Sequence, residues 1–162
     1  MKKSFLRFSS FASLALLVFV TGCMAPVLKA ALEGTAKDLS ALLDKGANPN
    51  TKGELGRPLL HIAVIKGDIK KVKLLLAKKL DVNTIDDAQK SALMYAADRG
   101  FSDIADLLIT AGADINAKTP DSREIAMRKF TPLMFAAQNG HLDIVKTLIA
   151  KGADITAEDN WH

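Results

Sequence analysis

The stretch Thr131-Pro-Leu-Met-Phe-Ala-Ala-Gln-Asn-Gly-His141 decides the fold of this 162-residue chain. Pro132 suits the first turn of a helix, because the backbone N–H that proline lacks has no helical partner there. Ala136 and Ala137 are small enough to let a second helix approach closely. Gly140 ends the helix in a left-handed turn, which glycine adopts without a steric penalty. The stretch therefore predicts a short helix, a tight turn and a second helix packed on the first.

The same pattern recurs towards the N-terminus at regular spacing. Gly34, Gly67 and Gly100 lie 33 residues apart, and Gly140 follows after 40. Each glycine has an alanine four residues before it and an apolar stretch after it, with Leu and Ile at helical spacing. A shared ending, such as Ala111-Gly-Ala-Asp-Ile-Asn116, closes each unit. Each unit leaves an apolar face that only a neighbour can bury, so we expect a linear stack.

These four copies in phase resemble the ankyrin repeat, and the resemblance covers residues 25–158. It implies an all-α solenoid of about four helix–turn–helix repeats joined by β-hairpin-like loops. We expect the repeats at about 25–52, 53–85, 86–118 and 119–158, followed by a short C-terminal end at 159–162.

Three departures from the pattern carry expectations of their own. Lys79 stands where the other repeats have glycine, so we expect it in a left-handed conformation at a cost of about 1 kcal/mol. Pro58 lies one place before the position of the family's proline. The connection Thr119–Phe130 holds seven extra residues, in which a single extra helical turn could form.

The first 23 residues have the pattern of a secretion signal. Three basic residues up to Arg7 precede the apolar run Phe11–Val20, and Val20-Thr-Gly-Cys23 resembles the bacterial lipobox. The resemblance implies a lipoprotein signal peptide at 1–22 and a lipidated N-terminus at 23–24, with diacylglycerol on the Cys23 thiol and an acyl chain on its amine.

Two alternatives to this signal peptide stay open. One is an uncleaved signal anchor, because Phe8–Leu28 is 21 residues without a charge. The other is coincidence in a cytoplasmic protein. A lipoprotein and an anchor both leave the remainder outside the inner membrane. The resemblance to bacterial lipoproteins, in which an aspartate after the cysteine favours the inner membrane, implies with Met24 at that position the outer membrane of a Gram-negative cell, facing the periplasm.

Charge and composition exclude several classes of protein. The formal net charge of +4 falls to +1 without residues 1–22, so nothing in the remainder argues for nucleic acid as a partner. The single cysteine, Cys23, permits no intrachain disulfide.

No catalytic, metal-binding or cofactor-binding pattern stands out. His61 and His141 fall where the ankyrin family uses histidine for backbone hydrogen bonds. No Cys/His zinc spacing, phosphate-binding glycine loop or nucleophile motif is present. We therefore expect no enzyme, no cofactor and no metal, although scattered acids leave a general acid–base pair open.

A group of lysines surrounds the second helix of the second repeat. Two hypotheses remain for it: an ordinary solvated helix face, or contact with anionic lipid head groups. Its members are Lys66, Lys70, Lys71, Lys73, Lys78 and Lys79.

The resemblance implies that a protein partner binds at the loop tips and along the first helices of the repeats. Tyr95 and Phe135 occupy equivalent positions, so we expect them side by side on one surface; the alternative is half-buried packing between helices. The extra residues of the third connection add the candidates Arg123 and Arg128. The remaining candidates are Leu55, Arg57, Ile62, Ile65, Lys66, Asp87, Lys90, Asp98, Arg99, Phe130, Gln138 and Asn139.

The sequence thus predicts a monomeric, non-enzymatic, lipid-anchored module that displays a rigid binding surface to an unidentified protein in the periplasm. Two alternatives share this architecture: an immunity or inhibitor protein that neutralises a toxin or envelope enzyme, and an accessory factor for a periplasmic enzyme.

Overall fold

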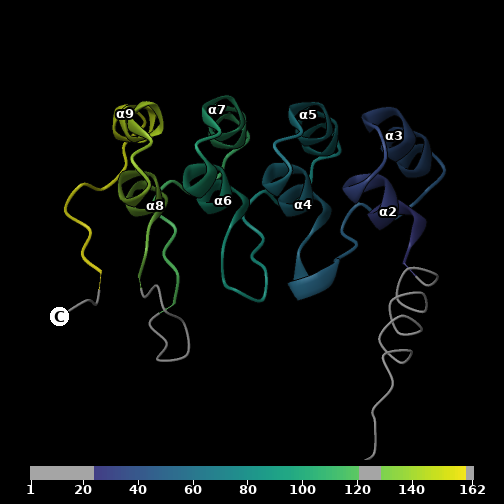
Figure 1. Ribbon diagram of the computed structural model, residues 1–162, viewed down its shortest axis with the longest axis horizontal. Coiled ribbons are helices and arrows are strands. Elements are labelled where there is room, and N and C mark those ends of the chain that lie inside the picture. Colours follow the sequence, from purple (N-terminus) through teal and green to yellow (C-terminus); the bar gives the residue numbers. More distant parts are fainter. Residues whose placement is uncertain (1–23, 121–128, 160–162) are drawn as a thin grey trace, which may run out of the picture.

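The computed structural model describes residues 24–120 and 129–159, and these form eight α-helices in two parallel rows (Figure 1). A short 3-10 helix, η1 (Glu54–Gly56), lies in the loop before α4. The α-helices are α2 (Pro26–Leu32), α3 (Ala36–Asp44), α4 (Leu59–Ile65), α5 (Ile69–Ala77), α6 (Ala92–Arg99), α7 (Ser102–Thr110), α8 (Pro132–Gln138) and α9 (Leu142–Ala150).

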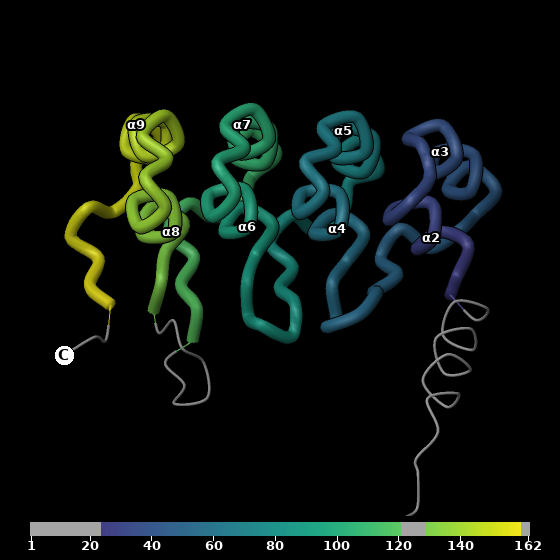
Figure 2. Tube along the Cα trace, viewed as in Figure 1, coloured from purple at the N-terminus to yellow at the C-terminus, as the bar shows by residue number. Residues whose placement is uncertain are grey.

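The helices pair into four consecutive repeats. One row holds α2, α4, α6 and α8, which we call the inner helices, and the other holds α3, α5, α7 and α9, the outer helices (Figure 1). The loops between pairs extend from the inner helices on the side away from the outer row (Figure 2). Two of these loops close with antiparallel bridges, Lys52 to Pro58 and Ile85 to Ser91. The predicted all-α solenoid with hairpin-like loops is confirmed.

The inner helices begin at hydroxyl caps wherever the sequence supplies one. The hydroxyl oxygens of Ser91 and Thr131 accept hydrogen bonds from the backbone N–H groups of Met94 and Met134, each at 3.3 Å. Such a cap satisfies one of the N–H groups that a helix leaves without a partner. Pro58 occupies the equivalent position before α4 and provides no side-chain cap.

The core runs without interruption along the stack. The alanines predicted to let helices approach are buried: Ala63, Ala96 and Ala136 expose nothing, and Ala30 is buried as well. Leu and Ile from each outer helix, such as Leu75, Leu108 and Leu148, close the core from the second row. Each repeat packs on its sequence neighbours, as a linear stack requires.

Asparagine side chains join the ends of successive outer helices. Asn83 donates from Nδ2 to the carbonyl oxygen of Gly112 at 3.1 Å, and its Oδ1 accepts from the backbone N–H of Asp114 at 2.8 Å. Asn116 makes the same two contacts with the next repeat, to Gly152 at 3.4 Å and Asp154 at 2.8 Å. We call this pair of contacts the asparagine clasp.

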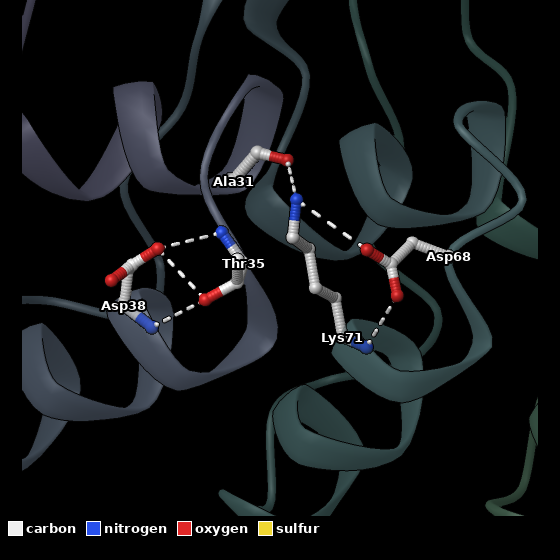
Figure 3. Close-up of polar contacts among 5 residues, drawn as sticks. All are labelled: Ala31, Thr35, Asp38, Asp68 and Lys71. Atoms are coloured by element: carbon white, nitrogen blue, oxygen red, sulfur yellow. Dashed lines mark hydrogen bonds and ion pairs between the residues drawn. The ribbon is translucent and has the colours of Figure 1, made fainter.

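One member of the lysine group, Lys71, does not lie on a solvated face, because it is 3% exposed. Its ammonium group points towards Ala31 and Asp68 (Figure 3). Its Nζ donates to the carbonyl oxygen of Ala31 at 2.9 Å and lies 3.5 Å from a carboxylate oxygen of Asp68. The carbonyl belongs to the last turn of α2, where helix carbonyls lack intrahelical partners. Lys71 therefore joins the first repeat to the second and is not available to a lipid surface.

Lys78 is also occupied, through an ion pair of 2.9 Å with Asp44. Within residues 24–120 and 129–159, no helix is long and apolar enough to cross a membrane. The predicted signal peptide, Cys23 and the extra helical turn expected near 121–128 lie outside the described residues.

Candidate partner-binding surface

The structure divides the predicted binding residues into three groups by exposure. Arg123 and Arg128 lie outside the described residues. The exposed group is Leu55, Lys66, Asp87, Arg99, Gln138 and Asn139; the half-buried group is Arg57, Ile65, Lys90 and Asp98; and the buried group is Ile62, Tyr95, Phe130 and Phe135.

Tyr95 and Phe135 are neighbours, but they do not form a surface. Tyr95 is 6% exposed and Phe135 is fully buried. The ammonium group of Lys90 lies over both rings, 5.4 Å from the centroid of Tyr95 and 4.3 Å from that of Phe135. The two rings therefore pack between repeats, where they cannot contact a partner. The expectation that they lie on one surface is wrong.

The prediction that Phe130 and Ile62 contact a partner is also wrong, because both side chains are buried. Phe130 packs edge-to-face on Phe135, with centroids 5.2 Å apart, and Ile62 lies in the face of α4 that the stack covers. Both apolar side chains lie in the junctions between repeats, where neighbouring repeats exclude water.

A buried polar cluster at the junction of the second and third repeats was missed by the sequence analysis. Asp86 is 2% exposed. It accepts hydrogen bonds from the Tyr95 hydroxyl at 2.6 Å and the Lys90 backbone N–H at 3.0 Å. Arg57 Nε lies 3.5 Å from the same carboxylate. Nothing in the repeat pattern distinguishes Asp86 from exposed Asp87, so burial could not be inferred from sequence.

The electrostatics of this cluster follow from burial. Loss of hydration, together with the neighbouring Asp86 carboxylate, raises the pKa of Tyr95 to about 12. The Tyr95 hydroxyl therefore stays protonated at neutral pH and donates to the carboxylate. The Arg57 guanidinium also lies 5.7 Å from the Tyr95 ring centroid. The cluster orders the loop residue Arg57 against α6 and leaves part of its side chain accessible.

The two described histidines bind backbone carbonyls, as predicted. His61 Nε2 lies 3.0 Å from the carbonyl oxygen of Lys90, and His141 Nε2 lies 3.1 Å from that of Asp98. A carbonyl oxygen can only accept, so Nε2 carries the proton in each case. Burial lowers the pKa of His61. Both side chains tie one repeat to the next.

Six of the candidates that are not fully buried form a mostly polar row along the carboxyl ends of the inner helices. Successive repeats contribute Ile65 and Lys66, then Asp98 and Arg99, then Gln138 and Asn139. Asn139 Nδ2 donates to the Asp98 carboxylate at 3.2 Å, which links two repeats along the row. We call these six residues the inner-helix row.

The charges of this row are mixed and suit a polar partner surface. Two exposed loop residues, Leu55 and Asp87, extend the candidate surface, and their backbones are joined because the Asp87 N–H donates to the Leu55 carbonyl at 3.0 Å. Among the residues that the structure describes, no group of three or more His, Cys, Asp or Glu side chains could hold a metal ion.

Comparison with known families agrees with this architecture. The profile for ankyrin repeats in three copies matches residues 27–119, and that for a single ankyrin repeat matches residues 128–160. The chain belongs to the ankyrin-repeat family. Ankyrin repeats serve as protein–protein interaction modules, so the inner-helix row belongs to a fold that binds proteins.

Several ankyrin-repeat proteins are similar to this chain over part of their length. Alpha-latroinsectotoxin-Lt1a of Latrodectus tredecimguttatus is 35% identical over 97 residues, which are 59% of this chain and 7% of the toxin. An ankyrin repeat-containing protein of Treponema pallidum is 35% identical over 88 residues, or 54% of this chain and 30% of that protein. Protein phosphatase 1 regulatory subunit 27 of Homo sapiens is 39% identical over 66 residues, which are 41% of this chain and 43% of that protein. The chain spans less than half of each relative's length.

Proposed function

We propose that this protein is a non-enzymatic interaction module, held on a bacterial envelope by lipid on Cys23 and displaying its ankyrin stack to a protein partner in the periplasm. The inner-helix row carries the proposal, because it is a mostly polar surface assembled from three repeats, with Lys66, Arg99, Gln138 and Asn139 exposed. The outer membrane is the proposed location, since Met24 follows the lipidated cysteine.

Rigidity of the stack supports this role. The row is held in place by the hydrogen bond of His141 to the Asp98 carbonyl, by the Asn139–Asp98 hydrogen bond and by the continuous apolar core. A surface that is already ordered loses little conformational entropy when a partner docks. The side chains of Lys66 and Arg99 offer two cations about one repeat apart, to which an acidic partner surface could bind.

The lipid anchor would also set the orientation of the stack. The described chain begins at Met24, directly after Cys23, and enters α2 from the side on which the loops lie (Figure 2). An anchor at Cys23 would place the membrane near the loop side of the stack. Helix α5 belongs to the outer row and would therefore lie on the side away from the membrane. The α5 lysines would then face away from the lipid, which favours the solvated-face hypothesis for them.

Replacement of Cys23 tests the anchor. In a Gram-negative host, the wild-type chain should incorporate labelled palmitate and fractionate with membranes. Cys23→Ser should lose the label, because serine offers no thiol for the diacylglycerol. An unlabelled wild-type chain would contradict the lipoprotein proposal and leave the interaction module to be tested separately.

Crosslinking in the native envelope tests the binding surface. We expect the wild type to capture a specific protein and Lys66→Glu/Arg99→Glu to lose it. Lys70→Glu/Lys73→Glu is the matched control, because it changes the net charge equally on exposed residues of α5. Circular dichroism should show that both variants fold.

Three outcomes decide between the functional alternatives. Capture of the same partner by the wild type and by both variants would contradict the inner-helix row as the binding site. Failure of the wild type and both variants to capture any specific protein would contradict the interaction module. A captured enzyme would favour an accessory or inhibitory role, which the similarity to a protein named as a regulatory subunit of a phosphatase supports.

A further inference from the structure

Two successive repeats carry a cation directly before the cap of the inner helix. This residue is Arg57 in the second repeat and Lys90 in the third. The Arg57 guanidinium lies 5.7 Å from the ring centroid of Tyr95 in the next repeat, and the Lys90 ammonium group lies 4.3 Å from that of Phe135 in the repeat after it. The two junctions therefore share one arrangement of cation and aromatic ring.

The two junctions differ in the buried residue that stands beside the cation. Asp86 and Thr119 are equivalent, because each lies three residues after an asparagine of the clasp and is 2% exposed. Each side chain also accepts the backbone N–H of the residue before the helix cap. These bonds run from Lys90 to Asp86 at 3.0 Å and from Phe130 to Thr119 at 2.9 Å. Of the two side chains, only Asp86 can carry a negative charge.

Arg57 consequently has a carboxylate partner in its junction, whereas Lys90 has none in the part of the chain that the structure describes. Arg57 Nε lies 3.5 Å from the Asp86 carboxylate. The other ion pairs among the described residues belong to Lys71 and Lys78. Lys90 is half-buried, so its ammonium group is a partly desolvated cation without a described counter-ion.

The backbone of Lys90 is fixed by three hydrogen bonds. Its N–H donates to the carboxylate of Asp86, and its carbonyl oxygen accepts from the Asp86 N–H at 3.2 Å and from His61 Nε2 at 3.0 Å. The rings of Tyr95 and Phe135 both lie within 6 Å of the ammonium group, a distance at which a cation is attracted to an aromatic face. The cation is therefore held in place before any partner arrives.

A carboxylate supplied by a partner suits this cation. Partial removal of water strengthens the attraction between opposite charges, and a group that is already ordered loses little entropy on binding. We propose that Lys90 binds an aspartate or glutamate side chain of the protein partner at the junction of the third and fourth repeats, in the role that Asp86 has for Arg57. The inference rests on the proposed interaction module and adds the chemistry that its partner must present.

Titration with an acidic peptide tests the site without the native partner. The probe is a peptide of alternating glutamate and glycine, and its analogue with glutamine in place of glutamate is the control. The full chain in non-ionic detergent is labelled with carbon-13 at lysine, and the signal missing from Lys90→Gln identifies the ε-methylene group of Lys90. We expect this signal to shift to saturation with the acidic peptide and to stay in place with the glutamine peptide.

Two substitutions should each weaken binding of the acidic peptide by about fivefold or more. Lys90→Gln removes the cation, and Thr119→Asp supplies within the chain the carboxylate that Asp86 supplies to Arg57. Lys90→Arg should keep the affinity, because Arg57 shows that a guanidinium fits this position. Lys73→Gln, at an exposed lysine of α5, is the matched control and should bind like the wild type. Circular dichroism checks that each variant folds, and Lys90→Gln decides if Thr119→Asp does not.

Three results would overturn the inference. A Lys90 signal that ignores the acidic peptide would show that the ammonium group is no carboxylate site. An equal shift with the glutamine peptide would show that charge is not recognised. Equal weakening by Lys90→Gln and Lys73→Gln would assign binding to the overall positive charge. These results depend neither on lipid at Cys23 nor on capture in the envelope, so they separate this site from the interaction module itself.

Discussion

The carboxylate of Asp86 is buried at a junction between repeats and depends on side chains from both of them. Arg57 comes from the loop of the second repeat and Tyr95 from the first helix of the third. A buried carboxylate without hydrogen bonds is strongly destabilising, so these contacts secure the junction.

Tyr95→Phe should lower the free energy of unfolding by about 1–3 kcal/mol, because Asp86 loses its shortest hydrogen bond while the ring remains. Phenylalanine fits, since Phe135 fills the equivalent position. Urea denaturation at pH 7 measures the loss. The wild type should also lose stability as pH rises from about 10 towards 12, because the pKa of the Tyr95 hydroxyl is higher in the folded than in the unfolded chain. An equal alkaline loss in the variant would contradict this assignment.

His61 should make stability depend on pH in the acidic range. Burial lowers its pKa, so the unfolded chain binds the proton more readily. Its contribution is complete above the unfolded value of about 6.5 and is lost as pH falls through the folded value. The urea midpoint of unfolding should decline less steeply below pH 7 in His61→Met than in the wild type. Methionine is compatible with this position, because Met94 and Met134 occupy it in the third and fourth repeats. Parallel slopes would assign the decline to other groups.

At the scale of the helix, the ends depend on single residues more than the interiors do. Lys79 has a φ of 55°, in the left-handed region, as the repeat pattern predicted. Gly112 and Gly152 hold the equivalent positions with φ of 93° and 95°. The end of α5 therefore carries strain that the ends of α7 and α9 avoid.

Lys79→Gly should raise the free energy of unfolding by about 0.5–1 kcal/mol, because glycine relieves the steric clash but gains freedom in the unfolded chain. Lys73→Gly, in the middle of α5, should lower the free energy of unfolding by about 1 kcal/mol. Thermal and urea denaturation of the two variants provide the comparison. A decrease for both would mean that the left-handed turn is not strained.

Over the whole molecule, stability is a sum of local terms and contacts between adjacent repeats. Lys71 contributes to one junction alone, since it bonds the last turn of α2 from α5. Its removal leaves the buried carbonyl of Ala31 without this donor. The consequence should be confined to the first repeat and should spread little along the stack.

Lys71→Met should therefore lower the opening free energy of α2 and α3 by about 1–3 kcal/mol and leave α8 and α9 unchanged. Amide hydrogen exchange, resolved by repeat, measures both quantities. Lys73 lies two residues after Lys71 and is exposed. Lys73→Met should therefore change neither the opening free energy of α2 and α3 nor that of α8 and α9. Uniform loss of protection in all four repeats would show that the stack unfolds as one unit.

The bonding of His61 and His141 to backbone carbonyls was implied by the resemblance to the ankyrin family. The sequence by itself determined the repeats, the helix pairs and the left-handed Lys79. These features depend on spacing along the chain and on local steric limits, which sequence records directly. The tertiary structure alone decided that Tyr95, Phe135, Lys71 and Asp86 are buried, while Lys66, Arg99, Gln138 and Asn139 of the inner-helix row stay exposed. Burial depends on how closely the next repeat approaches each face, and that distance results from the packing of all neighbouring side chains together.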